Sequence, residues 1–203
     1  MCNLIKSGKK TYYTFISVFT VFCSILCGAF LFSETIEFTA AVGAEAKPFL
    51  CFTLENAVTG DFDYAKSFRL KSVLGSQPVL LSFFTRTCAA CKDEIAALHT
   101  IYDTYKKQGI PFYLILVRVD GETDAEVLND AKAREYRIPV LYHKYPSSVF
   151  QSYLTDAQKK PLPFPVMYII DRFGIIRYAH VGFNKKAAKD ALEPAIHILD
   201  SLR

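Results

Sequence analysis

Short apolar runs separated by polar segments occur through most of this chain and predict the strands of a sheet. Val79–Phe84 is apolar at all but one position, as is typical of a strand buried on both faces. Residues 111–119 and 137–143 are two further runs of this kind. Val166–Ile170 and 175–181 flank the turn sequence Asp-Arg-Phe-Gly, which predicts a hairpin with the glycine at a positive φ.

Helical periodicity fills the intervals between these strands. In residues 88–107, Cys91, Ile95 and Leu98 recur at three- and four-residue spacing, which predicts one buried helical face. Thr123 opens a second helix, where Glu126 three residues later predicts a capping box. The predicted helices are 88–107, 123–136, 147–154 and 185–202.

This order of elements predicts one α/β domain. Strands that alternate with helices form a mostly parallel sheet covered on both faces, and a late hairpin adds antiparallel strands at one side. We therefore expect a domain at 48–203 with a central mixed sheet flanked by helices. The segment 49–70 shows no clear helical period, so edge strands and turns are predicted there.

The residues before this domain predict a membrane segment. Residues 1–11 form a basic tail, and 12–32 carry no charge over a length that spans a bilayer as a helix. Positive flanks stay in the cytoplasm, so the domain should lie on the extracytoplasmic (periplasmic) side, joined by the polar linker 33–47. The alternative to an uncleaved anchor is a signal sequence cleaved near Ala46 and a secreted domain.

Composition limits the partners and the way in which the fold is stabilised. The formal net charge is +4 without a long basic block, which argues against nucleic acid as a partner, and we expect a monomer. The predicted soluble domain holds only Cys51, Cys88 and Cys91, too few for a disulfide scaffold. The core must therefore hold itself together, with Cys51 as a buried residue near an edge strand.

Cys88 and Cys91 form a C-x-x-C pair where the strand Val79–Phe84 gives way to a helix. Unsatisfied N–H groups and the helix dipole at that position favour the Cys88 thiolate, which is the reactive form. Cys91 lies one turn further on, on the buried side and within bridging reach. This placement predicts that Cys88 attacks a disulfide and that Cys91 resolves the mixed disulfide.

Two other uses of the pair are open on the residues alone. A zinc site would need a second pair of ligands, and the histidines are scattered along the chain. An inert bridge over two residues closes a very small loop and stabilises a fold little. Redox exchange is therefore favoured, with the dithiol itself as the redox group and with neither a metal nor an organic cofactor.

The stretch PVLLSFFTRTCAACKDEIAAL resembles the strand–C-x-x-C–helix unit of the thioredoxin fold. FPVMYIIDRFGIIRYAHVGF resembles the second signature of the membrane-tethered, TlpA-like thiol–disulfide oxidoreductases, which include the reductases of cytochrome c maturation. The resemblance covers most of 49–203. It implies a thioredoxin-like fold, protein thiol or disulfide substrates, and a membrane electron donor or acceptor that resets the pair.

The resemblance also implies roles for individual residues. Cys88 would be the exposed nucleophile, Cys91 the buried resolver, and Pro165 a cis-proline that faces them. Backbone groups beside Pro165 would hold an extended substrate, and Phe164, Thr87 and Ala89 complete the predicted substrate-binding set.

The chain departs from the family at several positions. Thr87 stands where the family carries an aromatic residue, Ser82 where thioredoxin carries a buried acid, and Ala96 where a helix proline is common. Ala89 and Ala90 leave no acid or histidine between the cysteines. These differences leave the proton acceptor and the redox potential of the pair unassigned.

Two rival functions fit parts of the sequence. Thr85 and Cys88 match the Thr-x-x-Cys spacing of a peroxiredoxin-like thiol peroxidase, although Leu81 stands where that motif carries a proline. A non-enzymatic metal-binding or chaperone module would use the dithiol as a soft ligand, for example for Cu(I). The residues between the cysteines do not give the direction of electron flow, and a reductase is favoured over an oxidant.

Overall fold

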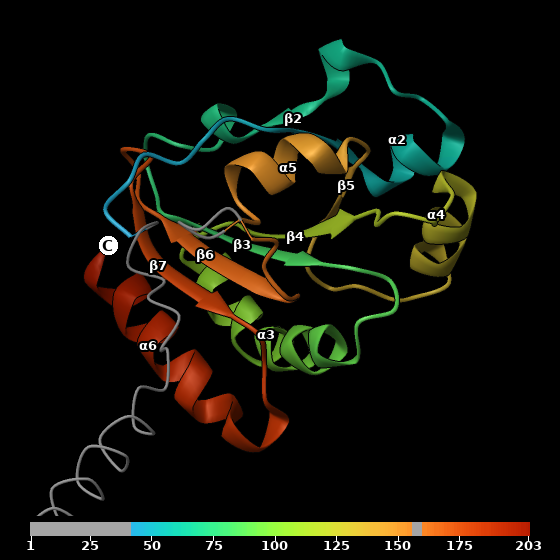
Figure 1. Ribbon diagram of the computed structural model, residues 1–203. Coiled ribbons are helices and arrows are strands. Elements are labelled where there is room, and N and C mark those ends of the chain that lie inside the picture. Colours follow the sequence, from blue (N-terminus) through green and yellow to red (C-terminus); the bar gives the residue numbers. More distant parts are fainter. Residues whose placement is uncertain (1–41, 156–159) are drawn as a thin grey trace, which may run out of the picture. The chain divides into compact units, whose positions relative to one another are not determined.

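The computed structural model in Figure 1 describes residues 42–155 and 160–203. Their centre is a seven-stranded mixed sheet in the order β2-β1-β5-β4-β3-β6-β7. Its strands are β1 (Leu50–Thr53), β2 (Phe68–Arg69), β3 (Val79–Phe84), β4 (Phe112–Val117), β5 (Val140–His143), β6 (Val166–Ile170) and β7 (Ile176–Val181). The helices are α2 (Leu54–Thr59), α3 (Ala89–Lys107), α4 (Asp124–Lys132), α5 (Pro146–Ser152) and α6 (Ala188–Ser201).

The central strand, β3, sets the register of the sheet. It pairs in parallel with β4, which pairs in parallel with β5. On its other side β3 runs antiparallel to β6, with Val79 opposite Ile170 and Phe83 opposite Val166. β6 returns as β7 through a turn in which Gly174 has a φ of 87°, as predicted. The prediction of a mixed sheet with a hairpin at one side is confirmed.

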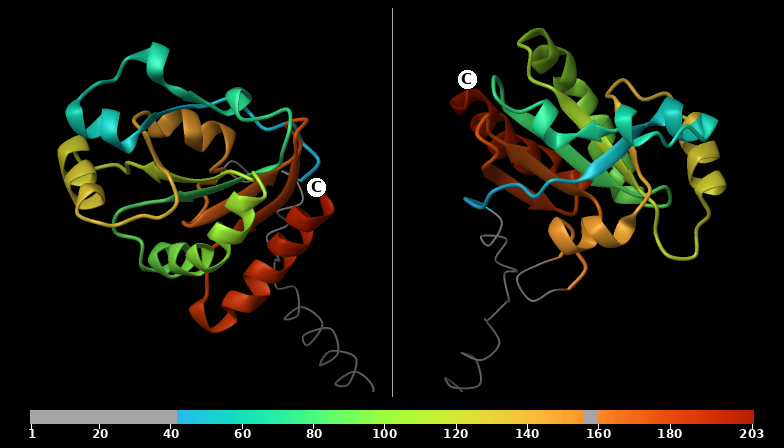
Figure 2. Two further views of the ribbon diagram at one scale, coloured as in Figure 1. Left: turned by 180° about the vertical axis from the view of Figure 1, so that it is seen from behind. Right: turned by 90° about the horizontal axis from the view of Figure 1, so that it is seen from above.

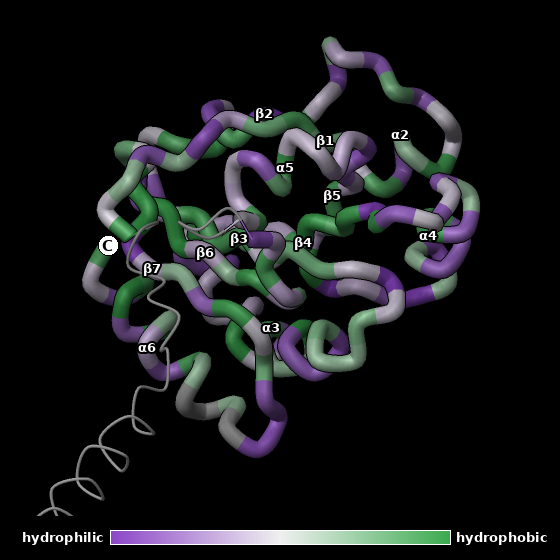
Figure 3. Tube along the Cα trace, viewed as in Figure 1, coloured by the Kyte–Doolittle hydropathy of each residue, from purple (hydrophilic) through white to green (hydrophobic). Residues whose placement is uncertain are grey.

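Side chains of β3 alternate between two cores, one on each face of the sheet. Leu80 and Phe84 join a core with α3 and α6, whereas Leu81 and Phe83 join a core with α5. Figure 2 shows α3 and α6 on one face of the sheet and α5 on the other. The tube in Figure 3 is largely hydrophobic through the central strands. Burial on both faces explains why Val79–Phe84 shows no alternation of apolar and polar residues.

The segment 49–70 corrects the prediction of edge strands and turns alone. β1 and β2 are present, but a short helix, α2, lies between them. Thr53 caps it by accepting a hydrogen bond from the Asn56 N–H at 3.2 Å, and Gly60 ends it with a φ of 76°. Six residues show too little of a helical period for the pattern to reveal them.

The remaining helices are confirmed with shorter bounds. α4 ends at Lys132 rather than at 136, and the capping box predicted from Thr123 and Glu126 is present. The C-terminal segment begins as a 3₁₀ turn at Lys185–Ala187 before α6 starts. Cys51 is fully buried in β1, and burial raises the pKa of its thiol. The expectation of a buried Cys51 is therefore confirmed.

The predicted membrane segment, 12–32, lies outside the described residues. Among residues 42–155 and 160–203, no helix has the length and apolarity needed to cross a bilayer. Part of the predicted linker is already bonded to the domain. The Gly43 N–H donates to the Ile176 carbonyl and the Ala46 N–H to the Gly174 carbonyl, both at 2.8 Å.

Candidate active site

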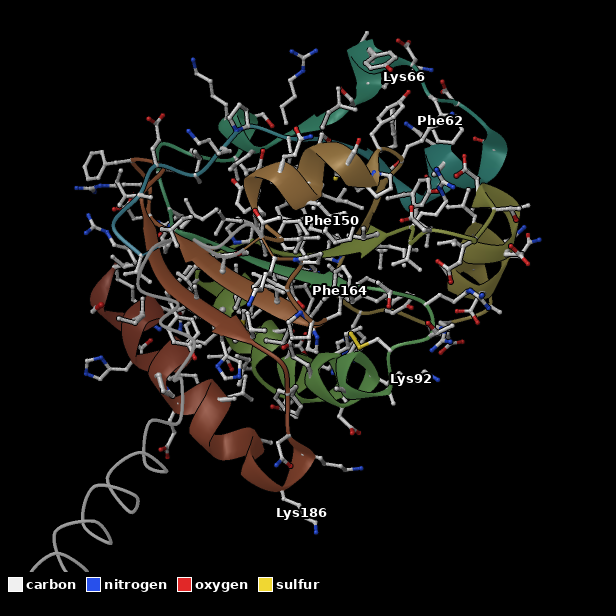
Figure 4. All side chains as sticks on the ribbon, in the orientation of Figure 1. Phe62, Lys66, Lys92, Phe150, Phe164 and Lys186 are labelled. Atoms are coloured by element: carbon white, nitrogen blue, oxygen red, sulfur yellow. A yellow bond between two sulfur atoms is a disulfide. The ribbon has the colours of Figure 1, made fainter. Side chains whose placement is uncertain are left out.

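Cys88 and Cys91 form a disulfide at the beginning of α3, with Cα atoms 5.3 Å apart (Figure 4). Cys88 is the N-cap residue of this helix, and its sulfur accepts a hydrogen bond from the Cys91 N–H at 3.1 Å. Cys88 is partly buried, whereas Cys91 is only 1% exposed. The more accessible sulfur is thus the one at which a backbone donor points, which is the arrangement that stabilises a thiolate.

The peptide bond between Phe164 and Pro165 is cis, as the resemblance implied. Pro165 precedes β6, whose first residue lies opposite Phe83 near the end of β3. Pro165 is therefore at the end of the sheet where the chain enters the Cys88 loop. The Pro165 carbonyl oxygen accepts a hydrogen bond from the Gly182 N–H at 2.8 Å.

The other predicted substrate-binding residues are partly or fully accessible. Thr87 and Ala89 are exposed on either side of Cys88. Phe164 is half-buried, and its ring packs edge-on against Phe150 of α5, with 6.2 Å between the ring centres (Figure 4). Contact of these residues with a substrate remains a prediction.

A buried acid, Glu94, lies one turn beyond Cys91 on α3, and the sequence analysis missed it. Its side chain is fully buried, and Oε1 accepts a hydrogen bond from the Ser82 hydroxyl at 2.5 Å. Oε2 has no hydrogen-bond partner among the described residues. Burial raises the pKa of the Glu94 carboxyl to about 7, against the lowering effect of the Ser82 hydrogen bond. Such a carboxyl can take up and return a proton at neutral pH.

The acid of this site therefore comes from the helix, and the strand supplies only its hydrogen-bond donor. The sequence did hold a signal for it: Glu94 falls three residues after Cys91 and four before Leu98, on the buried face of the helical period. A charged residue is seldom buried at such a position unless it is paired. Burial, and to a smaller extent the Glu94 charge, raises the pKa of the Tyr178 hydroxyl on β7 to about 12.

An ion pair holds the loop that precedes Cys88. Arg86 Nε lies 3.1 Å from Glu122 Oε1, and the second oxygen of Glu122 accepts the Val119 N–H at 3.2 Å. The Glu122 side chain is 8% exposed. The charge of Arg86 is thus largely balanced by its partner and stabilises a Cys88 thiolate little.

A cavity of about 280 Å³ opens beside Cys91, between α3 and the segment that follows α4. Apolar and aromatic side chains contribute much of its lining, among them Phe84, Ile95 and Tyr136. This volume is close to the lower end of the roughly 300–1,000 Å³ that is usual for ligand sites. Within the part of the chain that the structure describes, no three His, Cys, Asp or Glu side chains are placed to hold a metal ion.

Comparison with known sequences gives a family match and curated relatives. The profile of the AhpC/TSA family matches residues 42–179. The thiol-disulfide oxidoreductase ResA of Bacillus thuringiensis subsp. konkukian (strain 97-27) is 29% identical over 155 residues, which are 74% of this chain and 78% of that protein.

Solved structures share the fold. A thiol:disulfide interchange protein of the thioredoxin family from Chlorobium tepidum TLS matches 74% of this chain and 94% of its own, with a TM-score of 0.53 and 23% identity. The peroxidoxin BcpB from Mycobacterium tuberculosis matches 80% of this chain and 98% of its own, with a TM-score of 0.57 and 16% identity. The predicted thioredoxin-like fold is confirmed. A thiol:disulfide interchange protein and a peroxidoxin both share it, so the fold alone does not choose between these two activities.

Proposed function

Because this chain belongs to the AhpC/TSA family and is a thiol–disulfide oxidoreductase, we propose that Cys88 and Cys91 exchange disulfides with protein substrates outside a membrane. One observation carries the proposal: the accessible Cys88 caps α3 and is bonded to a buried Cys91, with the buried Glu94 one turn further on. The extracytoplasmic location rests on the uncharged segment 12–32 and its basic flank.

In the reducing direction, the Cys88 thiolate attacks one sulfur of a substrate disulfide. That disulfide breaks, and its second sulfur leaves as a thiolate that takes a proton from solvent. Cys91 then loses its proton and attacks the Cys88 sulfur, which breaks the mixed disulfide and releases the first substrate sulfur. Two electrons pass from the pair to the substrate, and a membrane dithiol donor returns them to the pair.

We assign to Glu94 the role of accepting the proton of the buried Cys91 thiol. Cys91 is 1% exposed, so solvent has little direct access to its proton. Glu94 lies one turn away on the same helix, with Oε2 free of other partners among the described residues. With a pKa of about 7, its carboxyl is partly ionised at neutral pH and so serves as the base for the resolving step.

The same acid supports a reductase rather than an oxidant. A negative charge near the pair disfavours thiolates, and an oxidant of this fold owes its high potential to a stabilised reduced form. Ala89 and Ala90 add no cation between the cysteines, and Arg86 is paired with Glu122. These features together lower the reduction potential of the pair.

The test of direction is the equilibrium reduction potential of the pair in the full chain, measured against glutathione and dithiothreitol buffers. We expect a value close to that of thioredoxin, about −270 mV. A value near −120 mV would reverse the direction of exchange. A pair that forms no bridge in any buffer would overturn the redox proposal.

The test of substrate class is a trapping experiment. Cys91→Ser should accumulate mixed disulfides between Cys88 and substrate proteins in cells, because the resolving step is blocked. The double variant Cys88→Ser/Cys91→Ser is the control and should trap none. Equal recovery from both variants would mean that the trapped proteins are not substrates of Cys88.

One observation favours a thiol peroxidase as a second candidate. Thr85 is buried three residues before Cys88 and its carbonyl oxygen accepts the Cys88 N–H at 3.4 Å, as in a compact Thr-x-x-Cys turn. In that case the Cys88 thiolate would take one oxygen from a peroxide to form a sulfenic acid, and Cys91 would condense with it to a disulfide and water. Rapid peroxide consumption by the reduced chain, lost in Cys88→Ser, would support this function. Consumption no faster than by free cysteine would exclude it.

A further inference from the structure

The turn between β6 and β7 carries an unusually exposed aromatic side chain. Phe173 is 73% exposed, and the guanidinium carbon of Arg172 lies 4.7 Å from its ring centre. A single exposed apolar residue needs no explanation, because most protein surfaces carry some. Two further features indicate a role for the exposed Phe173: the point at which the chain enters the domain, and the charges at this end of the domain.

The first described residues of the chain lie against this turn. The Gly43 N–H donates to the Ile176 carbonyl, and the Ile176 N–H donates to the Ala44 carbonyl at 3.0 Å. Val42, which precedes them, is itself 45% exposed. The chain therefore leaves the domain beside Phe173. In the sequence, only residues 33–41 separate this point from the uncharged segment 12–32, and nine residues span at most about 32 Å.

The charges at this end of the domain are mostly positive. α3 ends here, since it leads into β4, whose start lies opposite the start of β3. Leu74 approaches Gly174, which brings the 3₁₀ turn Leu70–Ser72 to the same end. The cations at this end are Lys71, Lys106, Lys107, Arg172, Arg177 and Arg203. The acids at this end are Glu45, Asp171, Asp200 and the chain terminus, of which Asp171 pairs with Arg177 and Asp200 with Arg203.

We propose that this end of the domain docks on the anionic surface of the bilayer in which the chain is anchored. The docking surface is defined by Val42, Arg172 and Phe173, together with Lys71, Lys106 and Lys107 at the same end of the domain. An aromatic ring flanked by cations fits the interfacial layer, where the ring meets acyl chains and the cations meet lipid phosphates. This inference rests on the anchored location in the proposed function, because the tether is what keeps the surface near lipid.

Docking of this end would point the disulfide away from the membrane. β6 runs from the position opposite Phe83 to the position opposite Val79, so its turn is at the end of β3 that is remote from Cys88. The length of a six-residue strand is about 20 Å. The pair would then face the compartment from which protein substrates arrive.

The chain contains no tryptophan, which provides a direct experiment. Phe173→Trp and Tyr64→Trp each give the full chain a single indole. Tyr64 is the matched control, because it is 53% exposed and its hydroxyl lies 2.8 Å from that of Tyr145, which follows β5 at the opposite end of the sheet. Both variants are reconstituted into vesicles of phosphatidylcholine and phosphatidylserine, with and without brominated acyl chains that quench a nearby indole.

We expect brominated lipid to quench the Phe173→Trp emission by about half or more and the Tyr64→Trp emission by roughly a tenth or less. Adding Arg172→Glu to Phe173→Trp should reduce the quenching about threefold, since a cation is replaced by an anion at the lipid surface. Quenching unchanged by Arg172→Glu would overturn the electrostatic part of the proposal.

Equal quenching of the two indoles, or quenching of neither while the chain floats with the vesicles, would overturn docking. Either result would leave the anchor and the exchange function intact, because reduction of a substrate disulfide is measured separately on the same vesicles. A chain that does not float with vesicles would overturn the anchored location, and docking with it.

Discussion

Glu94 and Asp171 are both buried carboxyls beside the paired strands β3 and β6, and the fold supplies them with very different numbers of hydrogen-bond donors. Asp171 Oδ1 accepts the N–H groups of Phe173 and Ile175, both at 2.9 Å, and Oδ2 accepts Arg177 Nε at 2.7 Å. Glu94 has the Ser82 hydroxyl alone, and its second oxygen is without a partner among the described residues.

This difference separates a structural carboxyl from a reactive one. Burial acts to raise the pKa of Asp171, but the hydrogen bonds from Ile175, Arg177 and Phe173 lower it overall. For Glu94 burial dominates, and the pKa rises to about 7. A carboxyl saturated with donors stays charged and stabilises a turn, whereas a carboxyl with a free oxygen is available for proton transfer.

Asp171→Ala removes the carboxyl that accepts three hydrogen bonds, and it is expected to have the largest effect on stability. Two backbone N–H groups and the Arg177 side chain would lose their acceptor, so the free energy of unfolding should fall by about 3 kcal/mol and the Tm by roughly 6–12 °C. Thermal unfolding of the full chain in detergent measures this. Asp103→Ala is the control, because the side chains of Asp103 and its partner Arg137 are both more than half exposed and the pair should contribute about 0.5 kcal/mol. Equal losses of unfolding free energy in the two variants would show that the number of hydrogen-bond donors to a carboxyl does not determine its contribution to stability.

Glu94→Gln tests the carboxyl that has only one hydrogen-bond donor. The test is the pH dependence of the free energy of unfolding. The folded-state pKa of about 7 lies above the unfolded value of 4.5. Stability from the protonated acid is therefore full below pH 4.5 and is lost as the pH rises through 7, by on the order of 2–3 kcal/mol. Asp171 has the opposite sign, since its lowered pKa gives stability that is lost only as the pH falls below 3.8.

Glu94→Gln should therefore be more stable than the parent at pH 8 and gain nothing at pH 4.5. Unfolding measured at several values between pH 4 and 8 checks this. A parent chain whose stability is flat across that window would contradict the raised pKa of Glu94.

The same substitution should slow the resolving step of exchange. Without a base for the Cys91 proton, decay of the mixed disulfide at Cys88 should slow about tenfold, which corresponds to about 1.4 kcal/mol. Single-turnover kinetics with a disulfide peptide measure it. Asp171→Asn is the matched control and should leave the rate unchanged. A similar slowing in both variants would indicate a general loss of structure instead of a role for Glu94.

Ser82→Ala should give the smallest effect and would sharpen the comparison further. Glu94 would lose its one donor, at a cost of about 1 kcal/mol. The hydrogen bond from Ser82 lowers the pKa of Glu94, so its loss should move the pH-dependent fall in stability to higher pH. In the Glu94→Gln background the profile should stay flat. A fall that stays at the same pH would mean that Ser82 does not influence the acid.

Much of the fold could be predicted because its strands β3 and β6 are buried along their whole length. Val79–Phe84 and Val166–Ile170 lie between two cores, and such runs stand out in a sequence. The helix α2 could not be found in this way, because it is too short to display a period. Its boundaries depend on Thr53 and Gly60, whose residue types are equally common in turns.

The site could be predicted only as far as local spacing reaches. Cys88 and Cys91 are three residues apart, and their places at the helix start follow from the change of pattern at Phe84. Glu94 was missed because the group that bonds it, the Ser82 hydroxyl, lies on β3, twelve residues earlier in the chain. A sequence alone does not show which charged residue on a helix will be covered by distant parts of the chain.

The pairing of residues 43–46 with residues 174–176 has a consequence for the order in which the chain matures. The first described residues of the domain pair with residues made about 130 positions later, and such distant contacts form slowly. We expect the neighbouring elements β3, α3 and β4 to fold first, while the N-terminal segment waits for β7. If the chain is exported as it is synthesised, residues 43–46 stay without these partners until most of the domain has crossed the membrane.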